Sequence, residues 1–291
     1  MKTTNILTTT ILAIAGVALT ASSAQALTYN NGDIFAGFRA TGGTGGTSDY
    51  IINLGSISQF QAGGSLADGN LHSLSLTNLG ADLTTNFGGW YNRSDFLFSI
   101  FGVVKPGGTI GAQSYGNQTM FWSNAETTIG TQSIAQKGFA AASLGTPTNN
   151  MVAVGNTYAG SSQLSGETQA GGLLQAIANS NTYGNTTSNF SGAAYPANKY
   201  FTLTPFKEPE TGFNNTPKVL DLYQINSGNT GNAALVGGFG INSTGNISFS
   251  TDLTDFIAPV PEPASAGALF SAFLGLVGLS KRRRAARAVR A

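Results

Sequence analysis

The chain has 291 residues, with 14 lysine and arginine residues, 13 acidic residues and no cysteine. The missing cysteine excludes disulfide bonds, thiolate catalysis and cysteine-ligated zinc together. Between Leu27 and Val260, seven basic residues stand against twelve acidic ones, a net charge of −5, so this stretch lacks the clustered positive charge that nucleic-acid binding requires.

The first 26 residues have the pattern of a secretory signal peptide. Lys2 supplies the positive start, residues 6–19 are mostly apolar, and Ala24 and Ala26 form a small-x-small cleavage site. Threonines interrupt the apolar stretch, which is too short to span a membrane comfortably, so a cleaved signal is favoured over an anchor helix. We therefore expect export through the Sec translocon and cleavage by signal peptidase, leaving a mature chain that begins at Leu27.

Residues 27–255 read as one exported β-rich domain. Glycine- and asparagine-rich turns separate its β-prone runs, and in the last run Ile247 and Phe249 alternate with polar residues, as expected of a half-buried strand. The first two runs resemble a hairpin joined by TGGTGGTS, which lacks the Gly-Lys-Ser/Thr ending of a phosphate loop. The runs are 33–40, 49–60, 95–104, 119–124, 218–225, 232–241 and 246–251. Their number predicts a mainly β fold, an antiparallel sandwich or jelly roll.

Helical patterns are fewer. In residues 167–180, Leu173, Leu174 and Ile177 recur at helical spacing, and Glu167 stands near the start, where a negative charge is favoured. Residues 65–87 have room for one short helix. The sequence therefore predicts one or two short helices beside the β structure.

No arrangement of residues points clearly to catalysis. His72 is the only histidine, and Asp68 is the only carboxylate near it in the sequence, so a structural or surface imidazole is the favoured interpretation. Glu208 and Glu210 flank Pro209, which favours an extended segment with both carboxylates on one side, as a glycosidase or lyase requires, or simply a solvated loop. We predict no catalytic residue, no cofactor and no metal site.

Two tryptophans leave a binding function open. Trp90 and Trp122 follow or precede other aromatic residues, and their flat rings either stack on sugar rings or fill the core. Abundant serine, threonine and asparagine predict a hydroxyl- and amide-rich surface. A carbohydrate-binding module acting on extracellular polysaccharide is therefore the alternative to a purely structural role.

The C-terminal segment combines three features in a fixed order. A linker, 256–263, contains Pro261, Glu262 and Pro263, and an apolar run, 264–280, follows it. As a helix, residues 264–279 would extend about 24 Å, close to the ~30 Å hydrocarbon core of a bilayer. A basic tail, 281–291, comes last and would hold its end in the cytoplasm. The tail begins with Lys281, Arg282, Arg283 and Arg284.

This order resembles the PEP-CTERM sorting signal of bacterial exosortase substrates. The resemblance implies that an exosortase, a membrane-embedded cysteine transpeptidase, recognises Pro261, Glu262 and Pro263 and cuts nearby. It also implies a transmembrane helix at 264–280 that is discarded, as in a GPI signal. The start of the body, residues 32–60, is similar to uncharacterised exported proteins with the same tail, for which no activity is assigned.

Together these features predict an exported cell-surface or extracellular-matrix protein without catalytic activity. It would be anchored transiently in the inner membrane with a periplasmic body, and would then reach the cell surface or the medium. Its expected partners are the export machinery, the exosortase and, in the alternative interpretation, extracellular polysaccharide, with no nucleic acid among them.

Overall fold

The computed structural model describes residues 26–135, 141–164, 167–178, 181–184, 210–214, 216, 218–229 and 231–257. This part of the chain contains twelve β-strands, two α-helices and three short 3-10 helices at 57–59, 90–92 and 253–256.

Ten strands form one antiparallel sheet, and β5 and β6 form a small separate hairpin. The sheet order is β3-β12-β11-β10-β7-β4-β1-β2-β8, with β9 beside one end of β4. The strands are β1 (Asp33–Ala40), β2 (Ser48–Ser56), β3 (His72–Ser73), β4 (Phe96–Val104), β5 (Gly108–Ile110), β6 (Gln113–Tyr115), β7 (Thr119–Ala125), β8 (Gly172–Ala176), β9 (Thr211–Gly212), β10 (Lys218–Ile225), β11 (Ala234–Ile241) and β12 (Ile247–Ser250).

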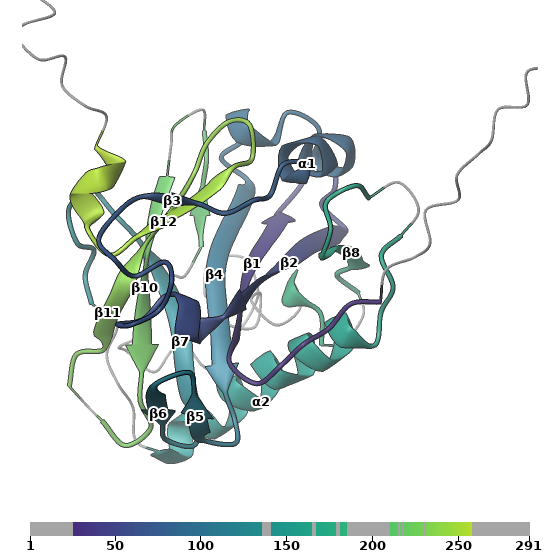
Figure 1. Ribbon diagram of the computed structural model, residues 1–291. Helices are drawn as coiled ribbons and strands as arrows, with labels where there is room; N and C mark the ends of the chain where they lie inside the picture. The colour runs from purple at the N-terminus through teal and green to yellow at the C-terminus, as the bar shows by residue number, and fades with distance from the viewer. Residues whose placement is uncertain are drawn as a thin grey trace, which may run out of the picture.

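The predicted mainly β, antiparallel body is confirmed, but its strands form one curled sheet, a half-barrel, in place of the two packed sheets of a sandwich (Figure 1). The predicted first hairpin is present, since β1 pairs with β2 from Asp33↔Ser56 to Arg39↔Asp49. A long sheet with the usual strand twist curls on itself, which allows one sheet to enclose its own core.

Alternation along the strands divides the apolar side chains between two faces. On β1, Ile34, Ala36 and Phe38 belong to the larger core, together with Phe98 of β4 and residues of every long strand. We call this side of the sheet the inner face. The 3-10 helix after β2 is followed by Phe60, whose ring lies 5.2 Å from that of Phe239 and closes the curl.

Helix α1 (Leu79–Phe87) packs against the inner core near the upper end of β1 and β4 (Figure 1). Leu79, Leu83 and Phe87 face that core and are buried. The predicted short helix within residues 65–87 is therefore confirmed.

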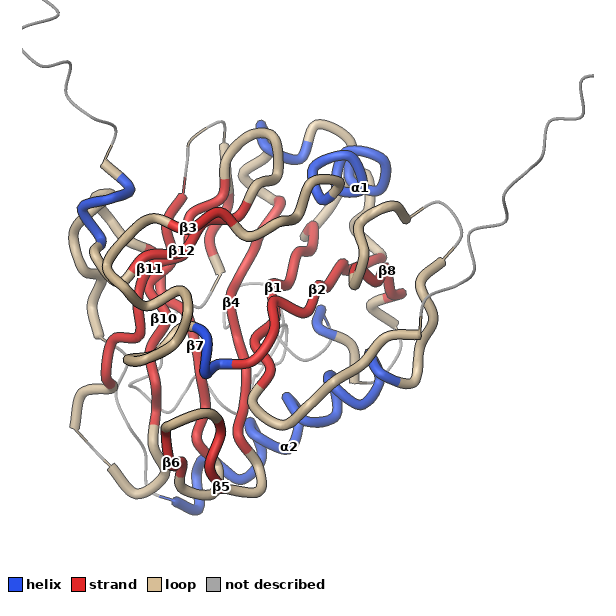
Figure 2. Tube along the Cα trace, viewed as in Figure 1, coloured by secondary structure: helices blue, strands red, loops and turns tan. Residues whose placement is uncertain are grey.

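Helix α2 (Ala141–Ala159) covers the opposite, outer face of the sheet (Figure 2). Met151, Val154 and Tyr158 pack there, and the Tyr158 ring meets Phe35 edge-on at 5.2 Å. The sequence pattern does not predict this helix. Gly145 and Pro147 lower helix propensity within it, so packing against the sheet, rather than propensity, stabilises it.

The helix predicted at 167–180 is wrong, because residues 172–176 form strand β8 at the edge of the sheet, paired with β2. Leu173 and Leu174, expected on one side of a helix, belong to the outer and inner cores respectively. Adjacent residues of a strand point to opposite faces, and pairing with the edge of β2 outweighs the local helical spacing.

Trp90 and Trp122 are both only 2% exposed, so neither offers a ring face to a ligand. Trp90 meets Phe213 edge-on at 5.0 Å within the inner core, and Trp122 of β7 lies in the outer core. The stacking role considered for them is therefore corrected to a packing role.

Among the described residues, no helix has the length and apolarity needed to cross a membrane. The predicted signal peptide, except Ala26, the sorting motif, the apolar run 264–280 and the basic tail lie outside the described residues.

Candidate functional site

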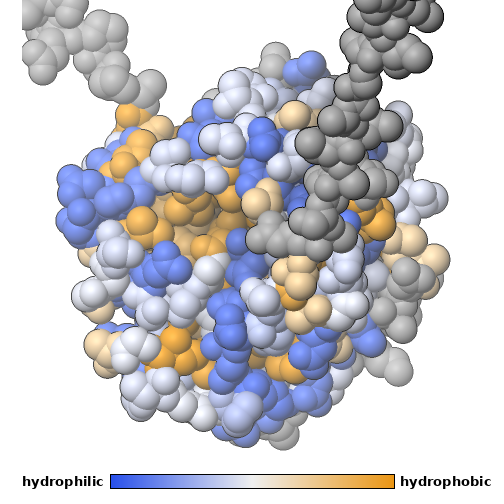
Figure 3. Space-filling model, turned by 45° about the vertical axis from the view of Figure 1, so that its right-hand side comes forward, coloured by the Kyte–Doolittle hydropathy of each residue, from blue (hydrophilic) through white to orange (hydrophobic). Residues whose placement is uncertain are grey.

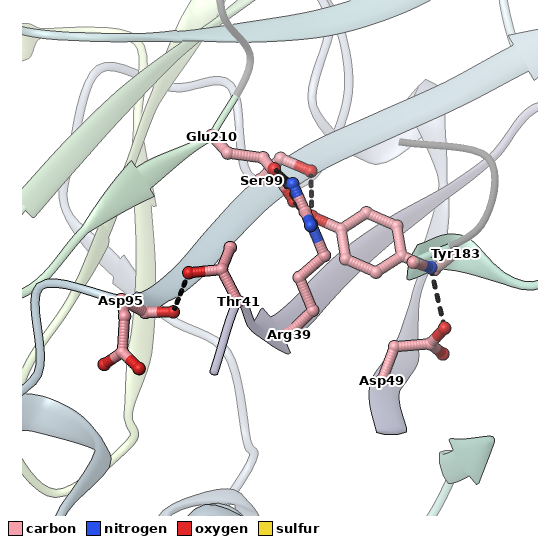
Figure 4. Close-up of polar contacts among 8 residues, drawn as sticks. Arg39, Thr41, Asp49, Asp95, Ser99, Tyr183 and Glu210 are labelled. Carbon is pink, nitrogen blue, oxygen red and sulfur yellow. Dashed lines mark hydrogen bonds and ion pairs between the residues drawn. The ribbon is translucent and has the colours of Figure 1, made fainter. Parts of the chain in front are cut away.

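Figure 4 shows a cluster of polar side chains, most of them buried. The cluster lies on the outer face, where most other buried side chains are apolar. Arg39 of β1 and Ser99 of β4 reach it because they alternate with inner-face residues on adjacent, paired strands. Glu210 immediately precedes β9, which pairs with β4 at Leu97 and Phe98. Tyr183 completes the cluster, so four segments far apart in the sequence meet there.

The cluster is held by charge-assisted hydrogen bonds. The Arg39 Nε donates to both carboxylate oxygens of Glu210, at 2.8 and 3.0 Å, and the Tyr183 hydroxyl donates to Glu210 Oε1 at 2.6 Å. Ser99 Oγ lies 2.8 Å from the Tyr183 hydroxyl. Burial raises the pKa of Tyr183 well above its ordinary value, with the Glu210 charge adding to the effect, so the phenol keeps its proton.

Asp49 of β2 lies beside this cluster, opposite Arg39 in the β1–β2 register. Burial raises its pKa to about 7, although hydrogen bonds from Gly184 and Thr182 and the charge of Arg39 lower it. The Gly184 amide donates to Oδ2 at 2.7 Å, while Oδ1 has no hydrogen-bond partner among the described residues. This carboxyl group therefore holds a proton over part of the neutral range.

The hydrogen bonds of the cluster connect four segments of the chain to one another. Four cavities lined by described residues have volumes between 180 and 460 Å³, and none is lined by Arg39, Asp49 or Glu210. Glu210 is taken up by its ion pair, whereas Glu208, its proposed partner, lies outside the described residues. The geometry therefore gives Glu210 a structural role.

A second carboxyl pair joins the loop after β7 to β10. Asp221 accepts from the Ser133 amide at 2.6 Å, and Glu126 accepts from the Gly130 amide at 2.6 Å. Burial and the neighbouring Asp221 raise the pKa of Glu126 to about 8, and burial also raises that of Asp221. At neutral pH the pair therefore retains a proton, and the bond from the Ser133 amide to Asp221 holds the loop to the sheet.

No set of three or more histidine, cysteine, aspartate and glutamate side chains in the described part of the chain is placed to hold a metal ion. His72 lies at the surface, where its Nε2 is 2.7 Å from Asp68 Oδ1. The surface imidazole expected from the sequence is thus what the structure contains.

The largest of the four cavities, 460 Å³, is lined by three glutamines, Gln61, Gln113 and Gln224, and by small or aliphatic residues. The Gln61 amide donates to Gln224 Oε1 at 2.6 Å across the cavity wall, although the two residues are 163 positions apart in the chain. The carboxamides come from the loop after β2, from β6 and from β10, which converge near the β5–β6 hairpin (Figure 1).

No family model, curated protein or solved structure matches this chain. The interpretation of its sites therefore depends on its own residues.

The two buried clusters and the glutamine-lined cavity were missed in the sequence. Arg39 and Asp221 lie in strands whose adjacent residues belong to the inner core, so alternation places these two side chains on the outer face. This alternation is the only feature of the sequence that indicates their position. Gln61, Gln113 and Gln224 belong to no motif, because only the curl of the sheet brings them together.

Figure 3 shows one face of the molecule, with apolar side chains in separate patches among polar ones.

Proposed function

We propose that this protein is an exported cell-surface or extracellular-matrix protein, processed by an exosortase-type transpeptidase through its C-terminal segment. The observation that carries the proposal is the order of segments: signal peptide, folded body, Pro-Glu-Pro, apolar run and basic cluster. Residues 264–280 span the inner membrane until cleavage, and Lys281 to Arg284 keep the short tail in the cytoplasm.

The ends of the described body support this division. Leu27, the first residue after the predicted signal cleavage, is only 5% exposed and packs in the outer core. A chain cut after Ala26 loses the isolated β-bridge between Ala26 and Ser162 but keeps its first side chain, Leu27, packed in the fold.

The other end of the body is anchored in the same way. Phe256 lies over Gly238 and Gly240 of β11, where an added Cβ would come within 2.8 and 2.9 Å of its ring. Asp252 caps this last 3-10 helix by accepting from the Thr254 amide at 3.0 Å. The body thus has packed contacts up to the residues that precede the sorting motif, which supports a signal separate from the domain.

The body itself is proposed to be non-catalytic. Of its buried carboxyl groups, Glu210 is engaged with Arg39 and Asp221 with the Ser133 amide, and the cavities described above are lined by other residues.

Replacing Pro261, Glu262 and Pro263 together by alanine tests the proposal. The variant should accumulate unprocessed in the inner membrane, detected by fractionation and by an antibody against the body. Pro259→Ala, a proline change outside the motif, is the matched control and should be processed normally. Release of the triple variant at the normal rate would contradict the proposal.

A further inference from the structure

The glutamine-lined cavity continues into a second one. The neighbouring cavity, 270 Å³, shares Ala62 and Gln113 with the first. We call the two together the amide groove. It runs between the loop 58–67, the turn and strand at 111–113, and the first residues of β11. A groove of two adjoining hollows suits an elongated ligand better than a compact one.

The carboxamides of the amide groove are fixed in orientation. The Tyr115 hydroxyl donates to Gln61 Oε1, the Gln61 amide donates to Gln224, and Gln224 Nε2 donates to Asn226 Oδ1 at 2.9 Å. Each carboxamide nitrogen carries two hydrogens, and this chain of bonds uses one of them at Gln61 and at Gln224. The second remains to be donated elsewhere, from a side chain whose position is already set.

Gln113 is placed differently. No hydrogen bond to its carboxamide is found among the described residues, and its side chain is half-buried at the junction of the two hollows. Its carboxamide offers two hydrogen-bond donors and an acceptor at the middle of the groove, and it takes no part in the hydrogen bonds that link Gln61 and Gln224.

The groove contains no charge. Its lining consists of carboxamides, serine and threonine hydroxyls, glycines and small or aliphatic side chains, and none of the lining residues is acidic or basic. Charged ligands require opposite charges or many donors when they leave water, so an uncharged groove selects against them. Its complement is a neutral molecule with many groups that both donate and accept hydrogen bonds.

We propose that the amide groove binds a neutral oligosaccharide or polysaccharide chain. Vicinal sugar hydroxyls match the paired donor and acceptor of a carboxamide, and Ala62, Ala67 and Leu235 provide apolar contact for the C–H faces of the rings. The binding mode requires no stacking on Trp90 or Trp122. The larger hollow, 460 Å³, lies within the ~300–1,000 Å³ range of small-molecule sites.

An extended peptide paired with β11 is the competing occupant. On the side of β11 that faces β12, only residues 234–237 lie before Gly238, where pairing with β12 begins. The β10–β11 register also shifts between Leu222 and Tyr223. A short, bulged edge is a poor template for strand addition. The carboxamides therefore favour the saccharide.

The test measures binding of the purified protein in detergent to a panel of immobilised hexasaccharides. The neutral probes are β-1,4-glucan, β-1,3-glucan, mannan and xylan hexamers, and the acidic probes are polygalacturonate and alginate hexamers. A Thr-Val alternating hexapeptide tests strand addition. Calorimetry on each positive probe then compares the wild type with Gln113→Ala, Gln61→Ala and Gln132→Ala, the last being an exposed glutamine on the outer-face loop.

The proposal predicts binding of at least one neutral hexamer and weaker binding of its disaccharide. Gln113→Ala, which breaks no internal bond, should weaken this binding about fivefold, since one hydrogen bond is worth ~1 kcal/mol. Gln61→Ala should weaken it further, and Gln132→Ala should leave it unchanged. Silence on all neutral probes, preference for the acidic probes, binding of the peptide alone, or indifference to Gln113→Ala would each overturn the proposal.

Discussion

Arg39 and Glu210 lie 171 positions apart in the sequence and form a buried ion pair, with Nε 2.8 Å from Oε1. The pair joins β1 to the segment that leads into β9. Tyr183 and Ser99 extend it to two further segments, so its hydrogen bonds are well satisfied for a buried charge pair.

Glu210→Gln should lower the free energy of unfolding by about 3 kcal/mol, because it leaves the buried Arg39 guanidinium without its counter-charge. Denaturant unfolding of the wild type and the variant measures the difference. The midpoint should fall without a change in slope, as expected for lost stability in an intact fold.

Asp95→Asn is the matched control for that experiment. Arg93 and Asp95 form an ion pair of similar length, 2.8 Å, but their side chains are 18% and 40% exposed. Exposed pairs contribute about 1 kcal/mol or less. Equal losses in the two variants would contradict the role assigned to burial of the Arg39–Glu210 pair.

The Glu126–Asp221 pair predicts a stability that falls with rising pH. Because the pKa of Glu126 is raised from 4.5 to about 8 in the folded chain, the unfolded chain loses its proton first. The free energy of unfolding should therefore decrease as pH rises from about 4.5 through about 8 and level off above it. Asp49, with a pKa raised to about 7, acts in the same direction.

Glu126→Gln separates the contribution of Glu126 to the pH dependence of stability from that of Asp49, because glutamine is an uncharged near-isostere of the protonated acid. Thermal unfolding measured between pH 4 and 9 should show a weaker decline in this variant, with the remaining decline ending near pH 7. A variant whose pH profile overlies that of the wild type would show that the pair does not retain the proton.

Asp82 of α1 predicts a local effect on the segment before β8. Its carboxylate accepts from the amides of Thr168 and Gln169, at 2.9 Å each, and from the hydroxyl of Tyr50 at 2.9 Å. Asp82→Ala should cost about 3 kcal/mol, as expected on losing several hydrogen bonds to one charged group. Hydrogen exchange should show early loss of protection at the Thr168 and Gln169 amides.

Asp68→Ala serves as the control for Asp82, because Asp68 is an exposed carboxylate paired with the surface His72. Its removal should leave the unfolding midpoint and the exchange at Thr168 and Gln169 unchanged. Unchanged exchange at Thr168 and Gln169 in Asp82→Ala would show that this carboxylate does not hold the segment.

Strands were readable from the sequence where alternation is strong and turns flank it. Residues 33–40 and 218–225 were predicted with the bounds that the structure gives them. In both, β-prone residues stand beside glycine- or asparagine-rich turns and the strand is buried almost throughout, so local and global preferences coincide.

The exceptions have a common physical cause. Residues 172–176 show helical spacing but pair with the edge of β2. Helix α2 forms despite Pro147 because its apolar residues pack against the outer face of the sheet. In both cases tertiary contact outweighs local preference. The buried pair of Arg39 and Glu210 was equally hidden, since a single arginine in a strand does not reveal its partner.

Intact mass spectrometry of the extracellular protein tests whether export is accompanied by removal of the C-terminal segment. We expect a chain that begins at Leu27 and ends near Pro261–Pro263, without residues 264–291. An extracellular protein that retains the apolar run and the arginines at its C-terminus would contradict it.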